Sequence, residues 1–270
     1  MLFAQETEKG VPRTLPMGQN THSPKVVQVS PSNSSKERFQ QSVSLEITGN
    51  YEFLSNNFRP WSAANAQVLW SIAKHTKLYA TLHVQERFAL QDISANIGIS
   101  YPITQWLVAT AEVNASPTAR IVPLFALYGQ LQCTLGNGVV LGGGYRYSRF
   151  TPVAASMIMP GLEWYKDAWR FAYSAYLTTL NDNARLLFSN AAQISYYWSD
   201  DNVLTISGTI GTEGFLLSPS VVQVFDIAGI YLIGRYGILP KLALTHEFLW
   251  QRQGNLFDRF GVQVGLRYTF

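Results

Sequence analysis

The chain has 270 residues, of which 14% are charged, 13% are aromatic and 47% are hydrophobic, and its formal net charge is +3. A typical soluble domain has about 25% charged residues, so the composition argues against an ordinary soluble globule, and the hydrophobic fraction excludes disorder of the whole chain. The single cysteine, Cys133, excludes a disulfide scaffold, every apolar run is too short for a membrane-spanning helix, and the net charge is too small to predict nucleic-acid binding.

Residues 1–41 differ from the rest of the chain. They are rich in Ser, Pro, Gln, Asn, Lys and Glu, show no hydrophobic periodicity and include the linker-like run Ser30–Ser35. The first residues, Met1–Glu6, resemble the end of a secretory signal peptide, although a basic start and a full apolar segment are missing. We predict that residues 1–41 are a signal-peptide remnant and a disordered N-terminal extension, with a segment that plugs a pore or binds a partner as the alternative.

From residue 42 onward, apolar and polar residues alternate. Val43, Leu45 and Ile47 alternate with Ser44 and Glu46, and the same period of two recurs up to residues 260–270. Because successive side chains of a β-strand point to opposite faces, each such segment has one apolar and one polar face. Several segments have ten residues or more, which is longer than the usual globular strand of about 5–6 residues.

Turn-forming residues separate these segments, and short connectors alternate with longer ones. The predicted short connectors are Lys74–Lys77, Pro102–Gln105, Gly136–Gly138, Lys166–Ala168, Ser199–Asn202 and Gly237–Pro240. The longer series comprises Leu54–Ser62, Ala115–Pro123, Thr179–Phe188, Glu213–Val222 and Arg252–Phe257, with two tight members at Ala89–Gln91 and Thr151–Ser156. These connectors divide residues 42–270 into about 14 predicted strands, or about 12 if two weak segments are loops, and either number leaves room for the roughly 9–11 residues of a membrane strand.

The direction of the apolar face distinguishes a soluble barrel from a membrane barrel. In an outer-membrane barrel the apolar face contacts lipid, the polar face lines the lumen, and short turns alternate with longer loops. Aromatic residues flank the short connectors, as in the belt at a membrane boundary; they are Tyr101, Trp106, Trp164, Tyr165, Trp169 and Trp198. The chain also stops on a strand-like segment at Phe270, which resembles the carboxyl-terminal signal by which bacterial barrels are recognised for assembly.

We therefore predict an all-β fold at residues 42–270: a transmembrane, antiparallel, up-and-down β-barrel in the outer membrane of a Gram-negative bacterium. The short connectors are expected to face the periplasm and the longer ones the outside. A soluble antiparallel barrel is the alternative.

The polar face carries charges of both signs. Its predicted lumen-lining residues are Glu46, Glu52, Arg87, Glu112, Arg146, Glu163, Arg170, Glu213, Glu247, Arg259 and Arg267, with no lysine in the clear strands. Arginine forms bidentate pairs with carboxylates. We expect these residues to pair and brace a narrow or occluded lumen, in preference to a selectivity filter, which usually has rings of one sign.

The sequence offers little for catalysis. Some outer-membrane barrels are lipid hydrolases with a Ser/His pair on the lipid face, and His246 does lie on the apolar face beside Leu244 and Phe248. No serine partner can be named for it and no Gly-x-Ser-x-Gly motif occurs, so a structural histidine is the favoured interpretation. No cluster has the spacing of a metal site. We predict no enzymatic activity, no cofactor and no metal.

Several short motifs resemble the YaiO-type family of outer-membrane β-barrels. In chain order they are Gln85–Phe88 with Asp92, Gly144–Phe150, Gly161–Lys166 with Trp169 and Arg170, Ser195–Trp198 with Asp201 and Asn202, and Gly265–Phe270. Their order and spacing carry the resemblance, which covers residues 42–270. It implies an outer-membrane barrel similar in style to those of exopolysaccharide exporters, and it implies no established activity and no catalytic residues.

Two functional hypotheses follow. The first is a narrow channel or envelope component linked to saccharide or exopolysaccharide export, because sugars stack on aromatic rings and hydrogen-bond to polar walls. The second is a non-transport barrel with an occluded lumen that acts as an anchor or assembly partner, and a lipid-modifying enzyme ranks third. The expected partners are outer-membrane lipid, the barrel-assembly machinery through Phe270, and a saccharide chain under the first hypothesis.

Overall fold

The computed structural model describes residues 13–14, 41–73, 75–87, 89–151, 153–180, 183–199, 201–218 and 221–270. The predicted N-terminal extension, residues 1–41, lies outside the described residues except for positions 13–14 and 41. No helix in the described part of the chain is long and apolar enough to cross a membrane.

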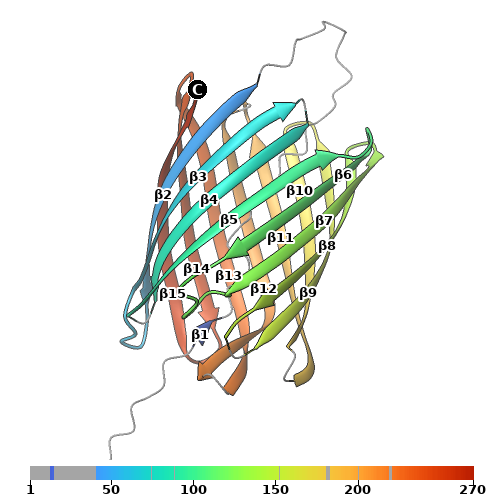
Figure 1. Ribbon diagram of the computed structural model, residues 1–270. Helices are drawn as coiled ribbons and strands as arrows, with labels where there is room; N and C mark the ends of the chain where they lie inside the picture. The colour runs from blue at the N-terminus through green and yellow to red at the C-terminus, as the bar shows by residue number, and fades with distance from the viewer. Residues whose placement is uncertain are drawn as a thin grey trace, which may run out of the picture.

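Long antiparallel strands form one closed sheet (Figure 1). They are β2 (Ser42–Leu54), β3 (Trp61–Ala73), β4 (Thr76–Arg87), β5 (Leu90–Pro102), β6 (Leu107–Ala115), β7 (Phe125–Gly136), β8 (Val139–Arg149), β9 (Ala154–Lys166), β10 (Trp169–Leu180), β11 (Asn183–Tyr197), β12 (Val203–Ser218), β13 (Val221–Leu239), β14 (Leu242–Gln253) and β15 (Phe257–Thr269). Each strand pairs with its neighbours in sequence, and β15 pairs with β2 to complete the ring. A two-residue strand, β1 (Arg13–Thr14), adds to β12 opposite Leu216 and Phe215.

The closed ring confirms the predicted antiparallel barrel of 14 strands, β2 to β15. Lipid cannot satisfy unpaired backbone amides and carbonyls, so a sheet in a membrane has to close on itself. Here every consecutive pair is antiparallel, from β2–β3 to β14–β15.

Apolar side chains cover the outside of the barrel, and polar side chains lie inside. Ile47, Ile97 and Ile210 are 56%, 67% and 65% exposed, whereas the polar residues Ser44 and Thr48, on the alternate positions of β2, are buried. This is the reverse of a soluble core, and it is the arrangement expected where lipid surrounds the apolar face.

A paired substitution on β15 tests the two faces. Val264→Arg places a charge on the exposed apolar face near mid-strand, and it should lower the free energy of unfolding in lipid vesicles by about 2–4 kcal/mol if the residue lies at the bilayer midplane. Gln263→Arg, one position earlier, points inward and should cost less. Equal losses in a denaturant titration of the two variants would contradict this orientation of β15.

Both ends of the barrel chain lie at one end of the barrel, which we call the terminal end (Figure 1). The amide of Phe270 donates to the carbonyl of Val43 at 2.9 Å. The turns at this end are tight: Asn137 and Gly138 between β7 and β8 have φ angles of 50° and 77°, the conformation of the type I′ hairpin that Asn-Gly favours. We call the opposite end the loop end.

Two predicted connectors at the loop end are wrong. The sequence predicts longer connectors at Thr179–Phe188 and Glu213–Val222, but β10 continues to Leu180 before β11 begins, and β12 continues to Ser218 before β13 begins. These segments are rich in the small and polar residues that favour turns. The strands nevertheless continue, because an extended hairpin satisfies its own backbone hydrogen bonds.

A belt of aromatic rings surrounds part of the terminal end. Ring contacts with centroid separations of 4.7–6.3 Å connect, in order, Trp164, Phe171, Trp169, Tyr196, Trp198, Tyr236 and His246. Amphipathic rings of this kind settle at the boundary between lipid and water. Tyr165 does not belong to the belt, contrary to the prediction, because it has the inward parity of β9 and its hydroxyl donates to Glu163.

Candidate functional site

The barrel encloses a cavity of about 440 Å³. The cavity lining draws on every strand from β3 to β15 and extends from Lys241 and Thr269 at the terminal end to Phe150 and Leu187 near the loop end. This free volume is comparable to that of a small-molecule pocket, about 300–1,000 Å³. The lumen is therefore elongated and narrow.

The predicted lumen residues all lie on inward positions of their strands, and none of them is exposed. Those that line the cavity are Glu112, Arg146, Glu163, Arg170, Glu213 and Arg267. Glu52, Arg87 and Arg259 are buried beside Trp61 near the loop end. Glu46 lies opposite Arg267, and Glu247 lies opposite Gln263 on β15.

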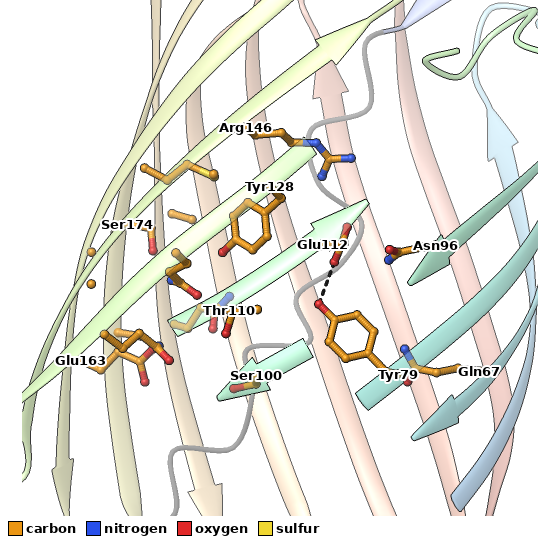
Figure 2. Close-up of a pocket in the computed structure, with 18 of the residues that line it drawn as sticks. Gln67, Tyr79, Asn96, Ser100, Thr110, Glu112, Tyr128, Arg146, Glu163 and Ser174 are labelled. Carbon is orange, nitrogen blue, oxygen red and sulfur yellow. Dashed lines mark hydrogen bonds between the residues drawn. The ribbon is translucent and has the colours of Figure 1, made fainter. Parts of the chain in front are cut away.

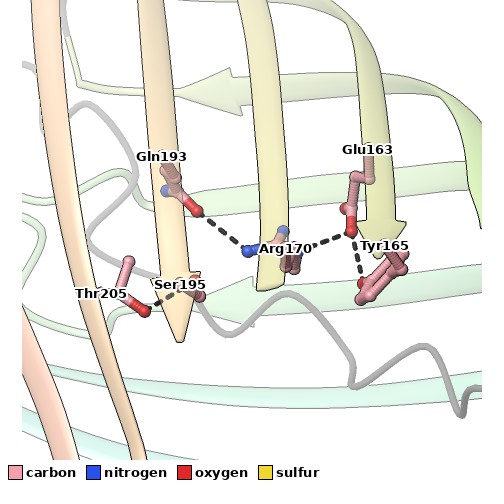
Figure 3. A network of polar contacts seen from close by, with 6 residues as sticks. All are labelled: Glu163, Tyr165, Arg170, Gln193, Ser195 and Thr205. Carbon is pink, nitrogen blue, oxygen red and sulfur yellow. Dashed lines mark hydrogen bonds and ion pairs between the residues drawn. The ribbon is translucent and has the colours of Figure 1, made fainter. Parts of the chain in front are cut away.

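Arg170 organises a polar network on β9, β10 and β11 (Figure 3). Its Nε lies 2.7 Å from Glu163 Oε2, and one terminal nitrogen donates to Gln193 Oε1 at 3.2 Å. The hydroxyl of Tyr165 donates to the same oxygen of Glu163 at 2.6 Å. The predicted Arg/Glu pairing thus occurs here, and it leaves this part of the wall nearly neutral.

Removing the carboxylate from this network should destabilise the barrel. In Glu163→Gln the buried Arg170 guanidinium loses its anion, so we expect the free energy of unfolding to fall by about 1–3 kcal/mol. As a control, Asp258→Asn breaks the pair with Arg252, whose side chain is 60% exposed, and should cost only about 0–1 kcal/mol. Thermal unfolding in detergent measures both, and equal melting temperatures for wild type and Glu163→Gln would contradict a bracing role.

A second group, the Trp61 cluster, braces the loop end. Arg259 Nε lies 3.2 Å from Glu52 Oε2, and the guanidinium groups of Arg87 and Arg259 lie 4.6 and 5.6 Å from the centroid of the Trp61 ring. Phe257 meets the same ring edge-on at 5.8 Å. Two cations on one indole gain cation–π attraction in a desolvated setting, so the cluster ties β2, β3, β4 and β15 together.

A tyrosine bridges three strands in the middle of the lumen. The Tyr79 hydroxyl donates to Glu112 Oε2 at 3.0 Å (Figure 2), and Gly98 on β5 pairs with both residues. A Cβ at Gly98 would lie 2.2 Å from Tyr79 Cζ, so only glycine lets the ring lie flat across β5. Glu112 therefore has a tyrosine as its partner where the sequence predicts an arginine.

Glu46 also departs from the predicted pairing. Its Oε1 accepts a hydrogen bond from Thr245 Oγ1 at 3.2 Å, and Arg267 donates instead to Ser44 Oγ at 3.1 Å. For both Glu46 and Arg267, a neutral side chain on a neighbouring strand is a closer partner than the oppositely charged residue.

Uncharged hydrogen-bonding groups and aromatic rings dominate the rest of the cavity wall (Figure 2). They include Gln67, Asn96, Ser100, Thr110, Tyr128, Gln130, Gln132, Ser174, Tyr176 and Gln193. The sequence places no lysine on the inward face of the clear strands, but Lys77 and Lys241, in or beside predicted connectors, also line the cavity at the terminal end.

Residues 116–124, between β6 and β7, are fastened to Asp92 of β5. Asp92 is 1% exposed, and its Oδ2 accepts from the amides of Arg120, Ile121 and Val122 at 2.9, 2.5 and 3.1 Å. Asp92 shares its inward parity with Ser94 and Asn96, so the amides that reach it lie on the luminal side of β5.

Further contacts hold the same segment in place. Ser116 Oγ donates to the carbonyl of Ile93 at 2.7 Å and accepts from the amide of Ala119 at 3.0 Å. β6 is short and pairs with β5 only as far as Ala95. Residues 116–124 therefore lie beside the part of β5 with which β6 does not pair. Asp92 was not among the predicted lumen residues, although its inward parity was readable from the alternation in β5.

The residues that the structure describes contain no group of three or more His, Cys, Asp or Glu that could hold a metal ion. His246 packs its ring parallel to Tyr236, with 5.2 Å between centroids, and covers the backbone of Gly234. Packing against Tyr236 and Gly234 thus accounts for the position of His246 on the apolar face.

A family model described as the YaiO membrane beta barrel domain matches residues 42–215. The chain belongs to the YaiO family of membrane β-barrels. The match confirms the resemblance, and together with the closed sheet and its apolar outer face it places this YaiO barrel in the outer membrane.

The YaiO barrel is also similar to solved outer-membrane barrels. A bacterial polysaccharide outer membrane secretin has a TM-score of 0.53 at 10% identity, covering 84% of this chain and 98% of that one. Omp33 of Acinetobacter baumannii has a TM-score of 0.50 at 10% identity, covering 85% and 99%, and OpdQ of Pseudomonas aeruginosa has 0.49 at 8% identity, covering 85% and 98%. Identities this low show the fold alone. Among curated proteins, none matches the chain.

Proposed function

We propose that this YaiO barrel is a narrow outer-membrane channel linked to the export of a saccharide chain. The observation that carries the proposal is the elongated cavity walled by tyrosine rings, amides and hydroxyls. The C–H faces of a sugar stack on aromatic rings, while its hydroxyls exchange hydrogen bonds with amides such as those of Gln130 and Gln193. Well-placed polar groups in a mostly preformed pocket give orientation and specificity.

A barrel that transports nothing is the second candidate, and the loop end favours it. Apolar side chains pack together there, with Phe150, Val153 and Leu187 in one cluster and Leu54, Trp61 and Phe257 in another. The segment 116–124 is fastened at the same end through Asp92. Under this candidate the barrel is an anchor or assembly partner, and under both candidates Phe270, which is exposed at the terminal end, is the contact for the assembly machinery.

Catalysis is not part of the proposal. The third possibility from the sequence, a lipid-modifying enzyme, depends on His246 as the base of a Ser/His pair. The ring of His246 is occupied in stacking on Tyr236, which favours a structural role.

Planar-bilayer recording of the purified protein tests the proposal. We expect a small, weakly ion-selective conductance that maltohexaose reduces reversibly. Tyr128→Leu removes an inward ring and should weaken this block, whereas Tyr145→Leu, on the exposed face, should leave it unchanged. A large, steady conductance would contradict a narrow lumen, and the absence of both conductance and saccharide binding would favour the non-transport barrel.

A further inference from the structure

Two tyrosine rings of the lumen lie over glycines of the adjacent strands. A Cβ at Gly98 would collide with the ring of Tyr79, and a Cβ at Gly144 would lie 3.4 Å from Tyr128 Cε2. Because no side chain separates them from the wall, both rings lie low against the sheet. A ring in this position keeps one face turned toward the cavity, which both tyrosines line (Figure 2).

Opposite charges flank Tyr128. Glu112 on β6 and Arg146 on β8 are its direct cross-strand neighbours, and both lie close enough to act electrostatically on its hydroxyl. Two strand spacings separate their backbones by about 9–10 Å. In the part of the chain that the structure describes, neither forms an ion pair: Glu112 accepts from Tyr79 at 3.0 Å, and Arg146 Nε donates to Ser148 Oγ at 3.4 Å.

An amide completes the group. Gln130 follows Tyr128 on the same inward face of β7, and among the described residues it has no hydrogen-bond partner. We call Tyr79, Glu112, Tyr128, Gln130 and Arg146 the tyrosine subsite. All five line the cavity and are half-buried, so a molecule in the lumen can reach their polar atoms and the two ring faces.

We propose that the tyrosine subsite binds a hexose unit of an uncharged saccharide chain. This inference rests on the proposed function and names its substrate class. The C–H face of a pyranose packs on an aromatic ring. Its hydroxyls donate to the carboxylate of Glu112 and accept from the guanidinium of Arg146, while the Gln130 amide can do both.

The pair of opposite charges favours an uncharged sugar over a charged one. A sugar acid gains from Arg146 but is repelled by Glu112, and an amino sugar meets the reverse, whereas neutral hydroxyls use both groups. The Glu163–Arg170 pair elsewhere on the lining, at 2.7 Å, is also neutral as a unit.

Calorimetric titration of the full-length protein in lipid nanodiscs, where both mouths are accessible, tests the charge argument. The probes are hexamers of glucose (maltohexaose), galacturonate and glucosamine. Maltohexaose should bind most tightly to the wild type. Glu112→Gln should strengthen binding of galacturonate, and Arg146→Gln should strengthen binding of glucosamine, each by about tenfold. Arg252→Gln, an exposed arginine at the loop end, is the control and should change neither.

A second pair of variants tests the position of the ring without altering its chemistry. Gly144→Val should displace the Tyr128 ring from the wall and weaken maltohexaose binding by about twofold to tenfold. Gly143→Val, one residue earlier, places its side chain in open space on the outer face and should leave binding unchanged.

The outcomes separate this inference from the proposed function. Maltohexaose binding that neither Gly144→Val nor Glu112→Gln alters would overturn the subsite and leave the saccharide channel standing. Tighter binding of either charged hexamer than of maltohexaose to the wild type would overturn the uncharged class. Binding of none of the three would overturn both proposals. Circular dichroism and heat-dependent gel mobility confirm that each variant is folded.

Discussion

Replacing Asp92 with alanine is expected to release residues 116–124 from the luminal side of β5 and to increase ion conductance. The carboxylate is the shared acceptor for three consecutive amides, those of Arg120, Ile121 and Val122. A hydrogen bond to a charged group contributes about 1.5–3 kcal/mol, and buried amides left without an acceptor add their desolvation cost. We therefore expect the barrel to lose on the order of 3 kcal/mol of stability or more.

Cysteine labelling reports the position of the segment directly, and conductance reports its effect on the lumen. A cysteine introduced at Val122, a buried position, should react slowly with a water-soluble maleimide in the otherwise wild-type barrel and rapidly in the Asp92→Ala background, after Cys133 has been replaced by serine. Asp226→Ala removes an exposed carboxylate from the same end and is the control. Unchanged labelling and conductance in Asp92→Ala would show that Asp92 does not hold the segment in place.

Glu52→Ala is expected to have the second large effect. It leaves the buried guanidinium of Arg259 without its carboxylate. It should also hold Arg87 less firmly in its position over the same Trp61 ring. Breaking a buried ion pair by removing one partner costs about 3–5 kcal/mol, because an uncompensated charge stays in a low-dielectric site. Denaturant unfolding in vesicles measures the loss.

The double variant Glu52→Ala with Arg259→Met separates pairing from packing. If the buried charge is the cause, removing it should restore part of the lost stability, since a buried pair can often be replaced by apolar residues at little cost. Arg252→Met breaks an exposed pair and should change stability by about 0–1 kcal/mol. A double variant as unstable as the single one would assign the loss to packing around Trp61.

The alternation of side chains was sufficient to predict the barrel. Glu46, Glu163 and Arg267 face inward because strand geometry fixes their parity, and parity is local information. The same rule would have excluded Tyr165 from the aromatic belt, because it is two positions from Glu163. The position of Tyr165 next to a turn therefore indicated the direction of its side chain less reliably than its parity did.

Contacts between distant parts of the chain could not be predicted from alternation. Parity shows that Asp92 points inward, but it does not show that residues 116–124 fold back to its carboxylate. Likewise, Trp61 lies at the first residue of β3, and its two arginines come from β4 and β15, which only the closed ring brings together. The extents of β12 and β13 were missed for a different reason, since turn-forming residues such as Gly214 and Ser218 continue a strand when the partner strand continues beside them.

The pairing of β15 with β2 has a consequence for how the protein is made. The contact between Arg267 and Ser44 joins residues 223 positions apart, and at the other end of the same seam Asp258 and Ser55 are still 203 positions apart. Pairing over such a sequence separation is slow, because the chain entropy is lost before the contacts form. The barrel therefore cannot be completed during synthesis: until the last strand is available, β2 and β14 are open edges that would pair with other chains. A nascent chain of this kind has to be kept unpaired until it reaches the membrane, and a version truncated before Phe257 would be a substrate for proteolysis or aggregation rather than a smaller barrel.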